Sequence, residues 1–166
     1  MSTNILAKIV DHKKIEVAER KTQMSIAQLE AMPLYHQGGN SLKLNLLNAD
    51  LTGIIAEFKR QSPSKGVIND IASVADVANA YTQFGAAGIS VLTDGKYFGG
   101  SLDDLLLARA TVNIPLLRKE FIVDEYQILE AKAHGADLIL LIAAVLSREE
   151  IKQLSEFAHR LELEVL

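Results

Sequence analysis

"EAKAHGADLILLI", residues 130–142, joins the end of a helix to a buried strand through a single glycine. The same order occurs earlier in the chain, in "YTQFGAAGISVLT" at residues 81–93. Gly85 and Gly135 are expected in the left-handed conformation that ends a helix, because glycine has no Cβ to clash there. The two segments form a weak internal repeat, and each copy predicts one return from a helix to a strand.

Strand and helix patterns alternate from residue 51 onward. Apolar runs predict strands at residues 53–59, 88–93, 114–121 and 138–145, and a fifth strand starting at Leu161. Helical patterns lie between them at residues 73–84, 102–110, 124–134 and 147–160, and their predicted N-caps are Ser73, Ser101, Asp124 and Ser147. Nearly continuous apolar strands are typical of a parallel sheet covered on both faces, and the alternation is typical of βαβ units. The predicted fold class is therefore α/β.

The first third of the chain carries helical patterns only. Residues 4–21 predict a helix that Asn4 caps, with an apolar stripe of Ile5, Ile9, Ile15 and Val17. Ser25 begins a capping-box pattern, Pro33 ends that short helix, and residues 41–48 predict one or two further turns. We therefore divide the chain into a helical extension, residues 1–50, and an α/β body, residues 51–166.

Composition narrows the functional classes. The chain has 166 residues, 49% of them hydrophobic, and a net charge of −4, which fits one globular domain. The charge balance and the 5% aromatic share argue against nucleic-acid binding. The absence of cysteine excludes disulfides and suits the cytoplasm, and no apolar run reaches the roughly 18 residues of a membrane span. The four histidines show no ligand spacing, so no metal site is expected.

Charged residues mark the end of the first predicted strand, in "IIAEFKRQSPSKG" at residues 54–66. Side chains alternate along a strand, so Ile55, Glu57 and Lys59 share one face, and Ile54, Ala56 and Phe58 share the other, which is expected to pack under the helices. Ligands of α/β sheets and barrels bind at the carboxyl ends of the strands. Glu57 and Lys59 therefore indicate a binding site, although such charges also often mark the exit of a strand into solvent.

The third predicted strand ends in the same way, in "IPLLRKEFIV" at residues 114–123. Lys119 shares a face with Phe121, whereas Arg118 and Glu120 face the other way and are expected to pair with neighbouring helices. A single lysine would fit the solvent-exit interpretation. Two lysines and a glutamate at strand ends favour a site for an anionic substrate.

"IIAEFKRQSPSKGVI" contains, in order, an apolar pair, any residue, Glu, aromatic, Lys, a basic residue, any residue and Ser-Pro-Ser. This order resembles the first motif of one enzyme family, indole-3-glycerol phosphate synthase. The likeness continues in family order through "GISVLTDGKYFGGSLDDL", "PLLRKEFIVDEYQI" and "GADLILLIAAVL". It covers the chain from Leu51 to Leu166, and the helical extension fits the family as well.

The resemblance implies a (β/α)8 barrel and a lyase of tryptophan biosynthesis that uses no metal or organic cofactor. Its substrate is 1-(o-carboxyphenylamino)-1-deoxyribulose 5-phosphate, and its products are indole-3-glycerol phosphate, CO2 and water. By position, Lys119 matches the general acid that protonates the substrate carbonyl. Lys59 matches the partner of the substrate carboxylate and in some descriptions donates a second proton. Glu57 matches a glutamate hydrogen-bonded within this cluster.

The resemblance also implies a set of substrate-binding residues. Ser62 matches a serine that helps to hold the phosphate. Three apolar positions match those that hold the aromatic ring of the substrate: Phe98, Phe121 and Leu140. For Leu140 an ordinary core role fits equally well, whereas Phe98 is expected in a glycine-rich loop, where a core role fits less well.

Length sets a further expectation. A complete barrel takes about 250 residues, so the chain is expected to hold four to five βα units and to be truncated at strand five. The resemblance places the general base and most of the phosphate site on later strands. We therefore expect the 166 residues alone to be inactive and to self-associate, and the full-length enzyme to be a monomer. A non-catalytic, self-assembling half-barrel is the alternative. Phosphoribosylanthranilate isomerase, a phosphate-binding barrel of the same pathway, is a weaker enzymatic alternative, because it lacks the Glu-aromatic-Lys and Ser-Pro-Ser pattern.

Overall fold

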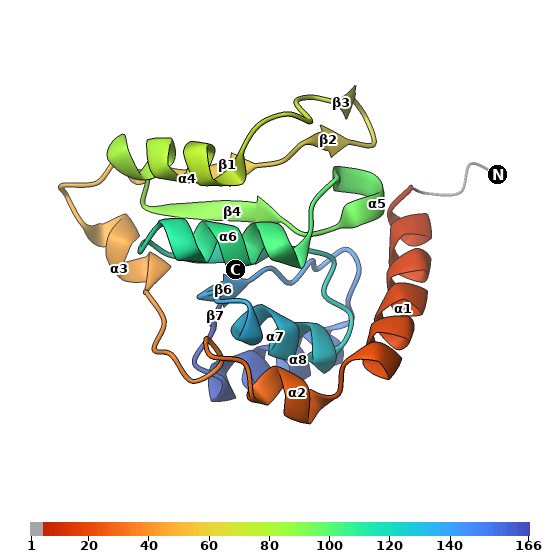
Figure 1. Cartoon of the computed structure of the whole chain (residues 1–166). Coiled ribbons are helices and arrows are strands. Elements are labelled where there is room, and N and C mark those ends of the chain that lie inside the picture. Colours follow the sequence, from red (N-terminus) through yellow and green to blue (C-terminus); the bar gives the residue numbers. More distant parts are fainter. Residues whose placement is uncertain (1–4) are drawn as a thin grey trace.

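Five parallel strands form one sheet in the order β1-β4-β5-β6-β7 (Figure 1). Their bounds are Ile55–Phe58 for β1, Gly88–Leu92 for β4, Leu116–Lys119 for β5, Leu138–Ile139 for β6 and Glu164–Val165 for β7. The computed structural model describes residues 5–166. The α/β prediction is confirmed, and neighbouring parallel strands joined by helices are the arrangement of the first part of a (β/α)8 barrel.

Each strand-to-strand connection contains a helix on the outer face of the sheet. The helices are α4 (Val74–Gln83), α6 (Leu102–Thr111), α7 (Glu125–Ala133) and α8 (Arg148–Arg160). Their N-caps are the predicted ones, and each cap side chain accepts a backbone N–H of the first turn: Ser73, Ser101, Asp124 and Ser147. Gly85 and Gly135 have φ of 77° and 80°, so both predicted left-handed glycines are confirmed. Outward residues of the sheet, such as Phe58 and Val91, form the main core with these helices.

The extension forms three helices: α1 (Ile5–Gln23), α2 (Ile26–Glu30) and α3 (Leu42–Leu47). The predicted cap Asn4 lies outside the described residues, and the capping box of Ser25 is present. The predicted apolar stripe of α1 is wrong at Ile5 and Ile15, which are 51% and 61% exposed. The third buried position is Lys13, because it lies four residues from both Ile9 and Val17 and therefore on their face.

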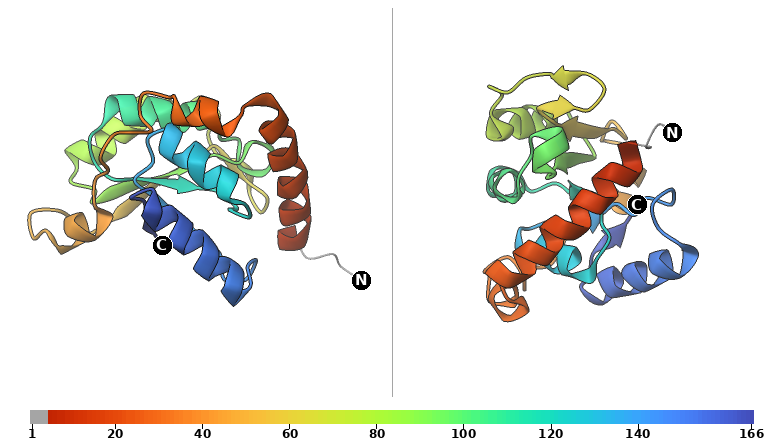
Figure 2. Two further views of the ribbon diagram at one scale, coloured as in Figure 1. Left: turned by 90° about the horizontal axis from the view of Figure 1, so that it is seen from below. Right: turned by 90° about the vertical axis from the view of Figure 1, so that its right-hand side faces the viewer.

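The extension helices lie at the two ends of the sheet. The right-hand view of Figure 2 looks at the side of the molecule toward which the strands of Figure 1 point, and α1 runs diagonally across that side. In Figure 1, α3 lies at the opposite end of the sheet. Leu42 of α3 packs against Leu117 and Leu138 on the inner face of the sheet. The extension and the sheet thus share packing, and the boundary at residues 50 and 51 stays a prediction.

The last two strands differ from their predicted bounds. The run at 138–145 pairs with β7 only at Leu138–Ile139, and residues 143–145 form a turn in which the Val145 N–H donates to the Ile142 carbonyl at 2.9 Å. One more bond follows, from the Leu141 N–H to the Leu166 carbonyl at 3.0 Å. The fifth strand begins at Glu164 and not at Leu161, which is the C-cap of α8.

Three short elements that the sequence patterns did not predict follow β1 and β4. The strands β2 (Gln61–Ser62) and β3 (Gly66–Val67) pair as an antiparallel hairpin around the Ser-Pro-Ser turn. The helix α5 spans Gly95–Phe98, so Phe98 ends a helical turn and does not lie in a loop. Gly99, with φ of 66°, caps that turn. No helix within residues 5–166 is long and apolar enough to cross a membrane.

Candidate active site

Glu57 joins the two lysines that the sequence analysis singled out. Its Oε1 accepts a hydrogen bond from the Lys59 Nζ at 2.8 Å, and its Oε2 accepts one from the Lys119 Nζ at 2.8 Å. Glu57 and Lys59 come from the end of β1, whereas Lys119 ends β5, with β4 between the two strands. One carboxylate therefore holds two ammonium groups at the carboxyl ends of the strands.

Strand register explains this meeting. Glu57 pairs with Ser90 of β4, and Ser90 pairs with Leu117 of β5, so these positions form one inward row. Lys119 lies two residues beyond Leu117 on the same face and spans β4 to reach Glu57. The small side chain of Ser90 leaves that path open, and its Oγ donates to the Glu57 Oε2 at 3.3 Å.

The three charged groups are partly shielded but open to a solute. Their side chains are 30% exposed for Glu57, 37% for Lys59 and 34% for Lys119. Burial by itself raises the pKa of Glu57, but the hydrogen bonds and charges of Lys119 and Lys59 lower it by more. The pKa of Glu57 therefore lies below its ordinary value, and the carboxylate stays ionised at neutral pH.

We expect the pKa of Glu57, followed by NMR of its side-chain carboxyl carbon, to lie below the ordinary glutamate value of about 4.3. Because the native pKa is depressed, the stability that this group adds is present above that ordinary value and is lost as pH falls through the native pKa. Lys119→Met should raise the pKa, whereas Lys152→Met, at an exposed position of α8, should leave it unchanged. An unperturbed pKa in the wild type would contradict the ion triad.

A cavity of about 440 Å³ opens beside this triad. Three predicted site residues line it, Lys59, Ser62 and Phe98, together with Ile5, Ile9, Pro63, Ser64, Lys65 and Ile68. The volume is within the range of small-molecule sites, and the walls combine apolar and cationic groups. The Ser62 Oγ accepts the Lys65 N–H at 3.2 Å and so holds the turn of the β2–β3 hairpin at the rim.

The remaining predicted residues occupy two different places. Phe121 lies against Phe98, with ring centroids 6.1 Å apart and planes inclined by 36°, so it belongs to the same region. Leu140 lies on the inner face of the sheet, where it packs against the cluster of Leu117, Leu138 and Leu42. This contact is compatible with a core role for Leu140, and its role in ring binding stays a prediction.

Several neighbours of the site were not predicted. Tyr81 of α4 donates its hydroxyl to the Glu57 carbonyl at 3.2 Å. The sequence carries a signal for Ser90, because it is the polar residue inside the apolar strand "GISVL" and it pairs with the inward-facing Glu57 of β1. Ile5 and Ile9 had none, since only the packing of α1 across the strand ends brings them to the cavity.

The opposite face of β5 carries the charges that were expected to pair with helices. Arg118 is fully buried and contacts Glu130 of α7 at 3.2 Å, and Glu120 contacts Lys13 of α1 at 3.1 Å. Arg118 also donates to the carbonyl of Gln127 at 2.5 Å. The expected pairing is confirmed, and these two charges do not face the inward row.

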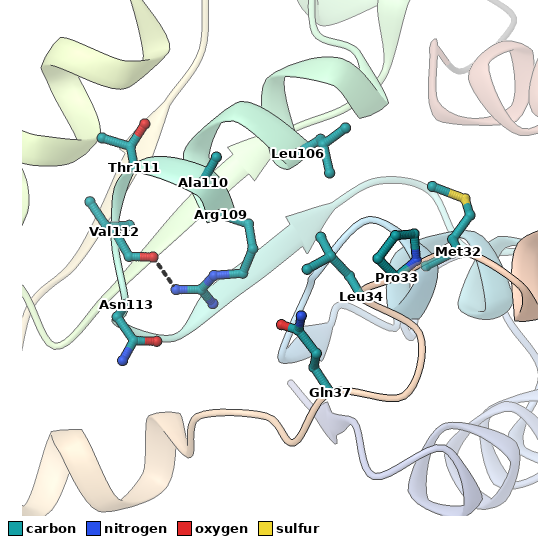
Figure 3. A pocket seen from close by; sticks show the side chains of 11 residues that line it. Met32, Pro33, Leu34, Gln37, Leu106, Arg109, Ala110, Thr111, Val112 and Asn113 are labelled. Carbon is teal, nitrogen blue, oxygen red and sulfur yellow. Dashed lines mark hydrogen bonds between the residues drawn. The ribbon is translucent and has the colours of Figure 1, made fainter.

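A second cavity, of about 610 Å³, lies between α6 and the segment that follows α2 (Figure 3). Leu106 and Arg109 face Pro33 and Leu34 across it, and the Arg109 guanidinium donates to the Val112 carbonyl. Asn113, also in its lining, precedes β5 and therefore lies at the end of the sheet away from Lys119. The larger cavity is thus separate from the charged triad.

The described residues offer no set of side chains that could together bind a metal ion. Within residues 5–166, no group of three or more His, Cys, Asp or Glu side chains is placed to hold a metal ion. The cationic groups at the strand ends are instead suited to a ligand with oxyanions.

Comparison with known proteins identifies one family. A sequence model of indole-3-glycerol phosphate synthase matches residues 6–166. A protein of that name from Bacteroides thetaiotaomicron is 47% identical over 163 residues, which is 98% of this chain and 62% of the relative. Namesakes from Polynucleobacter necessarius and Neisseria meningitidis serogroup C are 43% and 44% identical, and each match covers 99% of this chain and 64% of the relative. The chain thus spans less than two thirds of the length of these relatives.

Proposed function

The chain belongs to the indole-3-glycerol phosphate synthase family, and we propose that the protein that carries it is a carboxy-lyase that closes the indole ring. The substrate is 1-(o-carboxyphenylamino)-1-deoxyribulose 5-phosphate. A bond forms between its ring carbon that bears the carboxylate and its carbonyl carbon. The carboxylate leaves as CO2. The protonated carbonyl oxygen then leaves as water, while the carbon between the nitrogen and the former carbonyl carbon loses a proton and the ring double bond forms. The observation that carries this proposal is the bridging of Lys59 and Lys119 by Glu57 beside a cavity of matching size.

Each charged residue has a task in this reaction. Lys119 donates a proton to the carbonyl oxygen as the ring closes, and its Nζ already lies in the partly shielded triad. Lys59, which lines the cavity, pairs with the substrate carboxylate. Glu57 keeps both ammonium groups in place and supplies the negative charge that offsets their mutual repulsion.

The apolar and hydroxyl groups of the cavity complete the proposed site. Phe98 lines the cavity and Phe121 packs against it, and an aromatic pair of this kind can accept a planar ring. Ser62 offers a hydroxyl at the rim, where a phosphate would reach the β2–β3 turn. A phosphorylated substrate with an aromatic ring fits this division into an apolar wall and a polar rim.

An activity assay tests the proposal. The complete protein should be purified from a host that lacks its own synthase and mixed with the substrate, and the fluorescence of the indole product should be followed. A double variant, Lys59→Ala with Lys119→Ala, controls for contaminating enzyme. Formation of indole-3-glycerol phosphate by the wild type alone supports the proposal. No product at any protein concentration that binds the substrate would refute it.

Lys59 is expected to act mainly in substrate binding. Lys59→Ala should raise KM by about tenfold or more, because it removes the charge that faces the substrate carboxylate. Lys59→Arg keeps a charge that does not dissociate at working pH, so a kcat near the wild-type value in that variant would exclude Lys59 as a proton donor. Steady-state kinetics measure both constants, with Lys152→Ala as the exposed control. Wild-type KM in both Lys59 variants would contradict the assigned role.

A further inference from the structure

Lys13 lies in the middle of the buried face of α1, and its side chain has no exposed surface. Its Nζ is 2.8 Å from the Glu16 Oε2, 2.9 Å from the Asp94 Oδ2 and 3.1 Å from the Glu120 Oε1. Glu16 belongs to the same helix, whereas the other two acids belong to the α/β body, just beyond β4 and β5. One ammonium group of the extension thus ties the ends of two neighbouring strands together.

Asp94 connects Lys13 to the helical turn that carries Phe98. The Asp94 side chain is fully buried, and its Oδ1 accepts the Tyr97 N–H at 2.7 Å as the N-cap of α5. The other oxygen, Oδ2, faces Lys13 and has no hydrogen-bond donor besides this ion pair. Lys13 therefore compensates the charge of the residue that starts the turn ending in Phe98.

Glu120 connects Lys13 to the second aromatic residue of the site. Its Oε1 accepts the Phe121 N–H at 2.9 Å, and its Oε2 accepts the Thr93 hydroxyl at 3.2 Å. The side chain of Glu120 therefore holds the backbone between Lys119 and Phe121. Because Lys13 contacts the same Oε1, it stabilises the carboxylate that makes this bond.

We propose that Lys13 is a positioning residue that sets the Phe98–Phe121 pair, and through it the substrate, at the mouth of the site. It acts through Asp94 on one side and Glu120 on the other, and it touches neither aromatic ring. The two rings lie 6.1 Å apart, and their backbones are fixed by the two carboxylates that share the Lys13 ammonium. The extension helix α1 thus takes part in the function of the barrel, and this catalytic meaning rests on the proposed function.

Charge balance explains why the residue must be a cation. Without Lys13, the buried Asp94 would lose the cation that faces its Oδ2, and Glu120 would keep the longer contact of its Oε2 with the Arg118 guanidinium at 3.7 Å. Like charges repel strongly in a shielded environment, so the two carboxylates need the ammonium between them. Burial by itself lowers the pKa of Lys13, but attraction by Glu120, Glu16 and Asp94 raises it by more, so the ammonium stays charged. A neutral side chain of similar length would leave both acids to move apart or to take up water.

Amide hydrogen exchange tests the geometric part of the proposal without any assay of activity. In Lys13→Met, exchange at the Tyr97 and Phe121 amides should be at least about tenfold faster than in wild type, relative to the Val91 amide of the core. The matched control is Lys21→Met, which removes a lysine of the same helix that pairs with Asp124 at an exposed site. If Lys13→Met does not fold, Lys13→Arg keeps the charge in a different shape and should still accelerate the same two amides.

Kinetics of the complete protein test the catalytic part. Lys13→Met should raise KM by about tenfold while kcat changes less, since the aromatic wall binds the ring and Lys119 remains. Unchanged exchange at both amides would overturn the proposal, and so would altered exchange with unchanged KM. A wild-type protein without synthase activity would refute the proposed function, and exchange would still decide whether Lys13 positions the two segments.

Discussion

Replacing Lys119 by alanine is expected to lower the turnover of the complete protein by at least about 100-fold. One positioned acid contributes about this factor to a reaction that protonates a carbonyl oxygen. Lys119 is the proposed acid, and its Nζ is held 2.8 Å from Glu57 on the inward row of the sheet. Single-turnover measurements at saturating substrate would isolate the chemical step from binding.

Binding should change much less than turnover in this variant, because Lys59, Ser62 and the aromatic pair all remain. The dissociation constant of a substrate analogue that cannot cyclise would show this directly. Lys119→Arg should stay slow, since arginine keeps the positive charge but does not release its proton at working pH. Near-normal turnover in Lys119→Ala would remove Lys119 from the mechanism, even if the protein is a synthase.

Replacing the preceding residue, Arg118, by methionine is expected to destabilise the protein by about 3–5 kcal/mol. Losing one partner of a buried ion pair has an effect of this size because the remaining charge loses compensation, although Arg20 stays 3.3 Å from the Glu130 Oε1. Arg118 is fully buried, and both terminal nitrogens of its guanidinium lie 3.2 Å from the Glu130 Oε2. It also donates to the Thr93 hydroxyl at 3.2 Å. Urea denaturation of the complete protein would measure the loss.

Two further variants would test whether the loss of stability comes from the Glu130 carboxylate once Arg118 is gone. Adding Glu130→Gln to Arg118→Met should recover part of the stability, since a neutral amide needs no cation. Lys119→Met is the neighbouring control: its side chain is partly exposed, so the free energy of unfolding should change by about 1 kcal/mol or less. A wild-type midpoint for Arg118→Met would contradict the assigned role of the buried pair.

Lys119 is thus expected to affect turnover, and the adjacent Arg118 is expected to affect stability. The alternation of side chains along a strand predicts this difference from the sequence. Lys119 shares the parity of Leu117 and faces the inward row, and Arg118 shares the parity of Leu116 and faces the helices. The same alternation in "IIAEFK" placed Glu57 and Lys59 together on one face. Parity does not say how far apart two such rows lie, and only the register through Ser90 brings Lys119 to Glu57.

Two predictions that rested on apolar residues alone are wrong. Ile15 looked like part of the buried stripe of α1, but its position faces solvent, and Lys13 fills the buried position. Residues 140–145 are apolar, like the strand before them, yet residues 143–145 form a turn in which the Val145 N–H donates to the Ile142 carbonyl. Apolar character alone thus fixes neither the burial of a side chain nor the last residue of a strand.

Local chemistry in the sequence determined the α/β class, the helix caps, the left-handed glycines at 85 and 135, and the residues that carry charge to the strand ends. Each of these depends on contacts within a few residues or on the two-residue period of a strand. The tertiary structure decided the rest: which lysines share Glu57, which helix covers the strand ends, and why a lysine lies in the buried face of α1. A buried charge is stable only beside its partners, and those of Lys13 on the body, Asp94 and Glu120, are brought to it only by the packing of α1 across two strand ends.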